Sequence, residues 1–322
     1  MKIFAYMMMA GVLVAPAAHV RSADYPDKPV RFVVPFTPGG SADIFARAIG
    51  QKLAEAWNQQ VVIDNRGGSA GIIGSEIVAK SPPDGYTLML GITANVAINP
   101  GLFPKLAYDP ARDFAPVTLI AAAPYVMLVT PSLPVRSVPE FIALAKARPR
   151  QLNYASTGSG SAGHLTAALF ASMANVELTH VPYKNIGSIL VDMFAGRIEL
   201  MFVGLVSAQP HIKAQKLRAI AITGARRSPL MPELPTVAES GVKGFEVTGW
   251  YGVFVPAKTP AALVNRLNAD IVRAMKQPDV NARFAAEGAD LVGNTPAQFA
   301  SFVKGEIARW SRVVKLAGAR PD

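Results

Sequence analysis

One stretch decides the fold of this chain: Arg31-Phe32-Val33-Val34-Pro35-Phe36-Thr37-Pro38-Gly39-Gly40-Ser41-Ala42-Asp43. Its apolar run predicts a short strand, its glycines predict a tight turn, and Ser41 is of a residue type suited to be the N-cap of a helix. Apolar side chains then recur at helical spacing, at Ile44, Phe45, Ala48, Ile49 and Leu53. The first N–H groups of a helix have no partner within it, so such a turn is suited to bind an anion. An ordinary strand-to-helix turn is the competing interpretation.

A second turn of this kind lies further along the chain. Leu152–Ser156 predicts a strand, residues 157–163 read TGSGSAG, and His164–Met173 predicts a helix. Three glycines match the spacing of a dinucleotide-binding turn, namely Gly158, Gly160 and Gly163. A Rossmann unit carries that turn after its first strand, however, and several predicted strands precede this one. Hydroxyls and free N–H groups suit a carboxylate better than a pyrophosphate, so we expect a carboxylate-binding turn, with a dinucleotide site and a plain turn as alternatives.

Strands and helices alternate along the chain, which predicts an α/β fold with a parallel sheet. The predicted strands are Val30–Pro35, Val61–Ile63, Tyr86–Gly91, Pro116–Ala121, Tyr125–Pro131, Leu152–Ser156, Glu177–Val181, Leu200–Phe202, Leu217–Thr223 and Trp250–Val255. Amphipathic helices are predicted at Pro260–Gln277 and Pro296–Leu316. A chain of 322 residues is long enough for two domains. We expect a first lobe of residues 24–125 plus 247–322 and a second lobe of residues 126–246.

Composition restricts the class of protein. Apolar residues make up 51% of the chain and charged residues 17%, which permits large buried cores and argues against disorder. There is no cysteine, so disulfides and thiolate chemistry are excluded. The formal net charge is +10, but the lysines and arginines are scattered rather than gathered in one segment. This distribution favours attraction of small anions over binding of nucleic acid.

The N-terminus reads as an export signal. Lys2 supplies a positive start, and Ile3 to Ala18 form an apolar core of the length that signal peptides have. A membrane anchor is the alternative, but Pro16, His19 and Arg21 interrupt the run below the length that spans a bilayer. We therefore expect residues 1–23 to be a cleaved signal peptide and the mature protein to be exported.

The pattern Gly67-x-Ser69-x-Gly71 matches the turn that carries the nucleophile of α/β-hydrolases. Histidines for a catalytic triad are available at His164, His180 and His211. Further glycines crowd this turn and no histidine lies near the C-terminus, so a secreted serine hydrolase using Ser69 is the alternative interpretation. No histidine stands at ligand spacing from another histidine or an acid, so no metal site is predicted.

Several segments together resemble the solute receptors of the tripartite tricarboxylate transporters, the Bug family. They are Tyr25-Pro26-x-Lys28-Pro29-Val30-Arg31, Val34-Pro35-Phe36-x-Pro38-Gly39-Gly40-Ser41-x-Asp43, Val61-Val62-Ile63-Asp64-Asn65-Arg66, Pro83-Asp84-Gly85-Tyr86-Thr87-Leu88, Leu152-Asn153-Tyr154-Ala155-Ser156, His180-Val181-Pro182-Tyr183-Lys184, Pro210-His211-Ile212-Lys213 and Pro235-Thr236-Val237-Ala238-Glu239. The resemblance runs from about residue 25 to the C-terminus.

The resemblance implies a two-lobed, type II periplasmic-binding-protein fold with the ligand cleft between the lobes. It implies a periplasmic receptor, not an enzyme, that captures a small organic or aromatic carboxylate and delivers it to inner-membrane transporter subunits. We expect a monomer without cofactor, metal or nucleic acid. Carried onto this chain, the ligand-binding residues of the family are Thr37, Gly39, Gly40, Ser41, Asp43, Thr93, Ala94, Ser156, Thr157, Gly158, Ser159, Gly160, His164, Tyr183 and Val203. In the first turn of its helix, Asp43 is also favoured by the helix dipole alone.

Two positions depart from the family pattern. Asn185 stands where members commonly have the glycine of Val-Pro-Tyr-Lys-Gly, and Val203 stands where they commonly have the aspartate of Met-Phe-Asp-Asn. The second change removes a charge and a hydrogen-bond acceptor from a position suited to meet a ligand's amino group. We therefore expect a preference for carboxylates with a more apolar body over amino acids.

Overall fold

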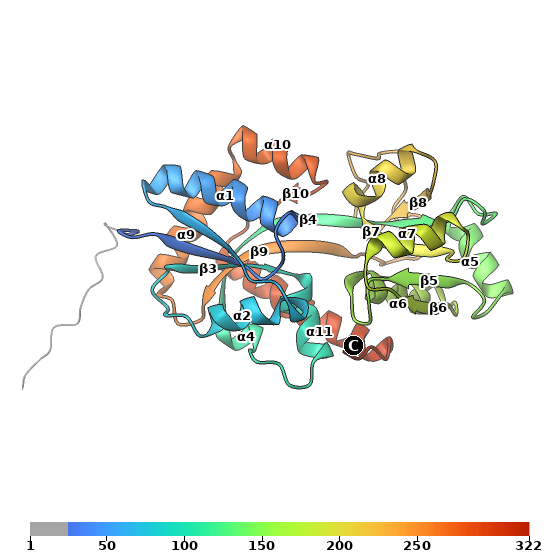
Figure 1. Ribbon diagram of the computed structural model, residues 1–322, viewed down its shortest axis with the longest axis horizontal. Helices are drawn as coiled ribbons and strands as arrows, with labels where there is room; N and C mark the ends of the chain where they lie inside the picture. Colours follow the sequence, from blue (N-terminus) through green and yellow to red (C-terminus); the bar gives the residue numbers. More distant parts are fainter. Residues whose placement is uncertain (1–24, 322) are drawn as a thin grey trace, which may run out of the picture.

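Two long antiparallel strands join the halves of the molecule in the computed structural model, which describes residues 25–321 (Figure 1). They are β4 (Phe114–Val129) and β9 (Thr248–Pro256), which pair from Phe114 opposite Pro256 to Pro124 opposite Thr248. The prediction of two strands, Pro116–Ala121 and Tyr125–Pro131, is wrong, because β4 runs unbroken through this segment. Proline has no N–H to donate, and Pro124 lies where β9 ends as the partner of β4 and β7 begins.

In the first lobe three strands extend the sheet from β9: β1 (Val30–Val34), β2 (Val61–Asn65) and β3 (Thr87–Ile92). The order is β2-β1-β3-β9-β4, with β1 parallel to both β2 and β3. One face is covered by α1 (Ser41–Trp57), α9 (Ala261–Met275) and α10 (Pro278–Ala286). Phe32 of β1 faces the cluster that includes Phe45 and Leu267 of these helices, whereas the neighbouring Val33 faces the opposite side.

The opposite face of this lobe and the hinge carry the remaining elements of the first lobe. They are η1 (Ser69–Gly71), α2 (Ile72–Ala79), the π-helix η2 (Thr93–Ile98), α3 (Asn99–Leu102), α4 (Pro110–Asp113) and α11 (Pro296–Leu316), with the short strand β10 (Asp290–Leu291) pairing with β4. Helix α11 packs against β4 and also against α6 of the second lobe, so it crosses from one lobe to the other.

The second lobe continues the sheet in the order β4-β7-β5-β6. Its strands are β5 (Asn153–Ser156), β6 (Thr179–Pro182), β7 (Leu200–Gly204) and β8 (Arg218–Ile222), and its helices are α5 (Val138–Ala147), α6 (Ala162–Ala174), α7 (Ile186–Phe194) and α8 (Leu205–Lys213). Strand β5 is parallel to β6 and β7, and β4 is antiparallel to β7 and β8. Each lobe thus has parallel strands whose carboxyl ends lead into the turns singled out by the sequence.

The two-lobed α/β fold is confirmed, but the prediction of a wholly parallel sheet is wrong for its centre. The pairs β3–β9, β9–β4 and β4–β7 are antiparallel, because β4 and β9 cross between the lobes in opposite directions. Helix α10 was not predicted. The lobe boundaries at 125/126 and 246/247 stay a prediction, and the predicted signal peptide, residues 1–23, lies outside the described residues.

A buried acid ties the hinge together. Glu306 of α11 accepts hydrogen bonds from the indole N–H of Trp250 and from that of Trp310, each at 2.9 Å. The backbone N–H of Trp250 donates to the hydroxyl of Thr93 at 3.0 Å. Strand β9, helix α11 and the start of η2 are therefore held in one hydrogen-bonded cluster where the lobes meet.

Candidate functional site

The first turn, residues 35–41, follows β1 and ends at the first residue of α1. Thr37, Gly39 and Gly40 are exposed, and Gly39 has φ +87°, a left-handed conformation that glycine adopts without strain. Asp43 is buried beneath the turn, where it accepts a hydrogen bond from Gly39 N–H at 3.0 Å and pairs with Arg47 at 3.0 Å. Asp43 supports the turn from inside, and its predicted contact with a ligand stays a prediction.

The pKa of Asp43 reflects this support. Burial alone would raise it, but the hydrogen bonds from Arg47 and from Gly39 N–H outweigh burial and hold the pKa below its usual value. The carboxylate is therefore ionised at neutral pH and keeps the turn in place.

The glycines of the pattern Gly67-x-Ser69-x-Gly71 are explained by packing against this first turn. A Cβ at Gly67 would lie 3.1 Å from the backbone nitrogen of Thr37, and one at Gly71 would lie 3.0 Å from the ring of Phe36. The segment needs glycine to approach the turn closely, so the pattern does not by itself indicate a nucleophile. The histidines proposed for a triad belong to the second lobe, whereas Ser69 belongs to the first.

The prediction of Ser41 as the N-cap of α1 is wrong: Gly40 is the N-cap, and the hydroxyl of the half-buried Ser41 instead donates to the carboxylate of Glu287 at 2.7 Å. Glu287 lies directly after α10, and sequence reasoning missed it because 246 positions separate the two residues. Thr93 is buried and accepts from Trp250, as described above, whereas the next residue, Ala94, is half-buried. Thr93 thus serves the hinge, and only Ala94 of this pair has notable exposure.

The second turn, residues 157–161, is built around a pair of stacked imidazoles. The rings of His164 and His180 lie 3.9 Å apart with an angle of 6° between their planes, and Tyr154 stacks on His180 at 4.9 Å. Gly160 N–H donates to Nδ1 of His164 at 3.0 Å. Ser156 is buried and donates to the carbonyl of Gly158, so in its 2.7 Å contact with His180 the imidazole Nε2–H is the donor.

His180 is a further residue of this turn that sequence reasoning missed as a site residue. It lies opposite Tyr154 in the parallel pairing of β5 and β6, two residues before the strand ends. That register is the signal that could have found it. Thr157 is exposed and Ser159 is half-buried, so these two side chains lie at the surface of the turn.

Tyr183 lies beside the second turn, because its backbone N–H donates to the carbonyl of Ser156 at 2.9 Å, and Asn185 and Val203 are the two departures from the family pattern. The hydroxyl of Tyr183 donates to Asp192 at 2.6 Å. Burial, and to a smaller extent this hydrogen bond, raises the pKa of Tyr183 to about 12. Asn185 caps α7, because its side-chain oxygen accepts from Ser188 N–H at 2.9 Å. Val203 is half-buried in β7 opposite Val126. The replacement of glycine by Asn185 therefore has a structural reason.

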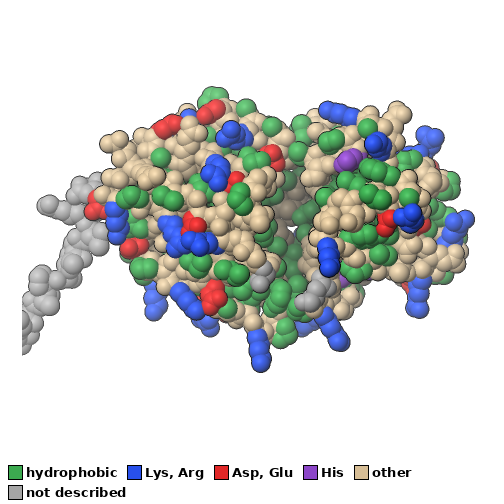
Figure 2. Space-filling model, in the orientation of Figure 1, with side chains coloured by type: hydrophobic (Ala, Val, Ile, Leu, Met, Phe, Trp, Pro, Cys, Tyr) green, Lys and Arg blue, Asp and Glu red, His purple; other side chains and the backbone are tan. Residues whose placement is uncertain are grey.

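The second turn contacts the first lobe at α3. Gly160 has φ +76°, and a Cβ there would lie 2.3 Å from a methyl group of Leu102 in the first lobe. Helix α3 follows η2, and Asn95 of η2 lies against Gly71 beside the first turn. In the space-filling view a groove separates the lobes and narrows to a gap at the centre (Figure 2). Lysines and arginines are scattered over this face rather than gathered in one patch.

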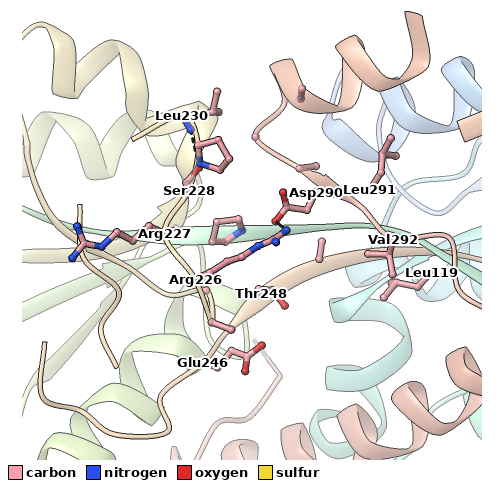
Figure 3. A pocket seen from close by; sticks show the side chains of 18 of the residues that line it. Leu119, Arg226, Arg227, Ser228, Leu230, Glu246, Thr248, Asp290, Leu291 and Val292 are labelled. Atoms are coloured by element: carbon pink, nitrogen blue, oxygen red, sulfur yellow. Dashed lines mark hydrogen bonds and ion pairs between the residues drawn. The ribbon is translucent and has the colours of Figure 1, made fainter. Parts of the chain in front are cut away.

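A separate pocket of about 530 Å³ lies between the lobes and over the hinge strands (Figure 3). Arg226 of the second lobe reaches across it to Asp290 of the first, with 3.1 Å between the charged groups. Its other walls include Leu119, Leu230 and Val292. None of the predicted ligand-binding residues lines this pocket, so it is distinct from the candidate site.

Within residues 25–321 no three histidine or acidic side chains gather as a metal ion would require. Across the same residues, none of the helices is both long and apolar enough to cross a bilayer.

Comparison with known proteins places these features in context. A family model described as "Tripartite tricarboxylate transporter family receptor" matches residues 45–319. Among solved structures, Rpa4515 of R. palustris, determined with adipate, is 41% identical, with a TM-score of 0.80 over 93% of this chain and 100% of that chain. MatC from Rhodopseudomonas palustris, determined with bound malate, is 35% identical, with a TM-score of 0.75 over 90% of this chain and 100% of that chain.

A third structure, described as the periplasmic binding protein BugD, is 30% identical. Its TM-score is 0.75, over 92% of this chain and 99% of that chain. Each of the three similarities covers at least 90% of this chain and therefore extends over both lobes.

Proposed function

The chain belongs to the tripartite tricarboxylate transporter receptor family, and we propose that it binds a small carboxylate between its lobes and delivers it to such a transporter. The observation that carries the proposal is that each lobe ends a parallel strand in a donor-rich turn, residues 35–41 and 157–161, and that the second of these turns packs against helix α3 of the first lobe. Relatives that were solved with adipate and with malate support a carboxylate as the ligand.

The turns suit this task because they offer hydrogen-bond donors and bring few charges of their own. Free N–H groups at the start of α1 and the exposed hydroxyls of Thr37 and Thr157 are available to carboxylate oxygens. Hydrogen bonds to a charged group contribute about 1.5–3 kcal/mol each. One end of the ligand would lie on the first turn and the other end on the second.

A ligand held by both lobes binds the closed arrangement better than the open one and therefore shifts the population toward it. The hinge strands β4 and β9 and helix α11 are the elements that would bend. We also propose export to the periplasm and a monomeric receptor, in keeping with the family. A serine hydrolase using Ser69 has no support in the family, whose members are receptors.

The test is isothermal calorimetry together with thermal shift, using malate, adipate, succinate and acetate. We expect at least one dicarboxylate to bind and to raise the melting temperature, as a ligand of the folded state must. Thr157→Val should weaken that binding about tenfold through loss of one hydroxyl donor. Thr179→Val, an exposed threonine on β6 outside the site, is the matched control and should bind normally. Absence of heat and of any thermal shift across the panel would refute the proposal.

A further inference from the structure

Ser41 takes part in a hydrogen-bonded chain that the first turn alone does not reveal. Its hydroxyl donates to Glu287 at 2.7 Å, and because an ionised carboxylate only accepts, the direction of this bond is fixed. Tyr251 of β9 is a second neighbour of the Ser41 hydroxyl. Burial raises the pKa of Tyr251, a hydrogen bond with Ser41 lowers it in part, and the charge of Glu287 raises it again. The phenol therefore keeps its proton at neutral pH and lies beside the Ser41 hydroxyl.

Aromatic packing holds Ser41, Glu287 and Tyr251 beside one another. Phe45 lies four residues after Ser41 in α1, and Phe284 lies three residues before Glu287 at the end of α10. The two phenylalanine rings stack at 4.1 Å, and Tyr251 meets Phe45 edge-on at 4.8 Å. Residues three or four positions apart share one face of a helix, so this stack brings Ser41, Glu287 and Tyr251 together.

The hydroxyl of Ser41 can offer a ligand only a hydrogen-bond acceptor. A serine hydroxyl has one proton and two lone pairs. The hydroxyl proton is directed at Glu287, so toward any other group the Ser41 oxygen can only accept a hydrogen bond. Toward a ligand, the Ser41 side chain is thus a hydrogen-bond acceptor, while the backbone N–H groups of the turn remain donors.

Glu287 also lies at the boundary between the lobes. Gly288, the residue after Glu287, would carry a Cβ 3.0 Å from Val206 and 3.2 Å from Leu230, both in the second lobe. Val206 lies in α8, three residues after Val203 of β7, which stands where family members commonly have an aspartate. Glu287 therefore brings a carboxylate from the first lobe to the neighbourhood where the second lobe has lost one.

We propose that Glu287, acting through Ser41, makes the first turn select a carboxylate that carries a hydroxyl over the same carboxylate without it. The inference rests on the proposed carboxylate-binding function. Glu287 is a positioning residue: it directs the Ser41 proton away from the ligand, and the Ser41 oxygen accepts from the ligand's hydroxyl. A carboxylate without that hydroxyl leaves the Ser41 oxygen unmatched when the cleft closes.

Malate and succinate test this directly, because they carry the same charge and differ by one hydroxyl. Calorimetry on the whole mature chain should show malate binding about tenfold more tightly than succinate, which corresponds to about 1.4 kcal/mol. Glu287→Ala removes the acceptor of the Ser41 hydroxyl, which can then donate to the ligand. Ser41→Ala removes the oxygen that accepts from the ligand. Each variant should therefore bring the ratio of malate affinity to succinate affinity close to one. Glu287→Gln should keep most of the preference, because its amide oxygen still accepts from Ser41.

Asp279→Ala is the matched control, since Asp279 lies at the start of α10, the helix that Glu287 follows, but pairs with Lys52 at 2.9 Å, and the affinity ratio of this variant should stay at the wild-type value. Equal binding of malate and succinate by the wild type, or an unchanged ratio in Glu287→Ala, would overturn the inference and leave the proposed function standing. Tighter binding of aspartate than of malate, lost in Glu287→Ala, would also overturn it, because Glu287 would then contact the ligand itself. If no carboxylate binds at all, the proposed function fails and the inference fails with it.

Discussion

Replacing Gly160 with alanine places a methyl group between the two lobes. The added Cβ would lie 2.3 Å and 2.9 Å from the two terminal carbons of Leu102, closer than any two carbon atoms can pack. Leu102 is itself buried, so it has little room to move away. Gly160 also has φ +76°, where an alanine is strained.

The two effects have different consequences. A side chain in the left-handed region costs about 1–2 kcal/mol and lowers the stability of the folded chain. Overpacking costs about 1–3 kcal/mol, and it is present only when the second turn meets α3. Opening the lobes relieves this second cost, so it appears as a loss of ligand affinity of about 5- to 150-fold.

The assay is calorimetry with malate and adipate, together with thermal unfolding of the free protein. We expect Gly160→Ala to lose affinity by at least fivefold while its melting temperature falls by only a few degrees. In a double-mutant cycle with Leu102→Ala, the affinity cost of Gly160→Ala should shrink, because the colliding methyl groups are gone. Wild-type affinity together with an unchanged melting temperature in Gly160→Ala would refute the contact between the turn and Leu102.

Four further expectations follow from the described contacts. Glu306→Ala leaves two buried indole N–H groups without an acceptor and should destabilise the chain by about 2–6 kcal/mol in urea unfolding, whereas Glu306→Gln should cost clearly less. Because folding lowers the pKa of Asp43, its ionised carboxylate stabilises the folded chain above the unfolded pKa of 3.8, and this stabilisation is lost as pH falls through the lower folded pKa. The stability of Asp43→Asn, measured by unfolding at decreasing pH, should lack this pH-dependent loss. Arg226→Ala removes an exposed ion pair between the lobes, so ligand affinity should change by less than about fivefold, and by less again at high salt. Wild-type protein should bind aspartate and glutamate weakly in calorimetry, and Val203→Asp should raise the affinity for aspartate; tight binding by the wild type would contradict the expectation drawn from Val203.

Much of the candidate site follows from the sequence because its parts are local. The turn of residues 35–41 needs only glycines, a following helix and free N–H groups, and all of these are visible within a dozen positions. The helix beginning after Ser161 is signalled in the same way, and its serine side chain does cap the helix. Membership of the family, recognised from short segments along the chain, is confirmed by the match over residues 45–319.

Other features depend on which segments pack together, and no local pattern carries that information. The run Ala121-Ala122-Ala123-Pro124 reads as a break between strands, yet β4 continues because β9 and then β7 supply partners on either side of it. Likewise His180 becomes a support of the second turn only through the register of β5 and β6, and the same pairing places its Nε2 beside Ser156.

What the sequence by itself determined is therefore the fold class and the backbone of the two turns, since both arise from preferences of neighbouring residues. What only the tertiary structure decided is how the side chains of those turns are committed. Ser41 reads as a free donor in the sequence, but packing of Phe45 on Phe284 brings Glu287 to its hydroxyl from 246 positions away. A hydrogen bond between residues so far apart is fixed by the packing of whole helices, and therefore no spacing along the chain predicts it.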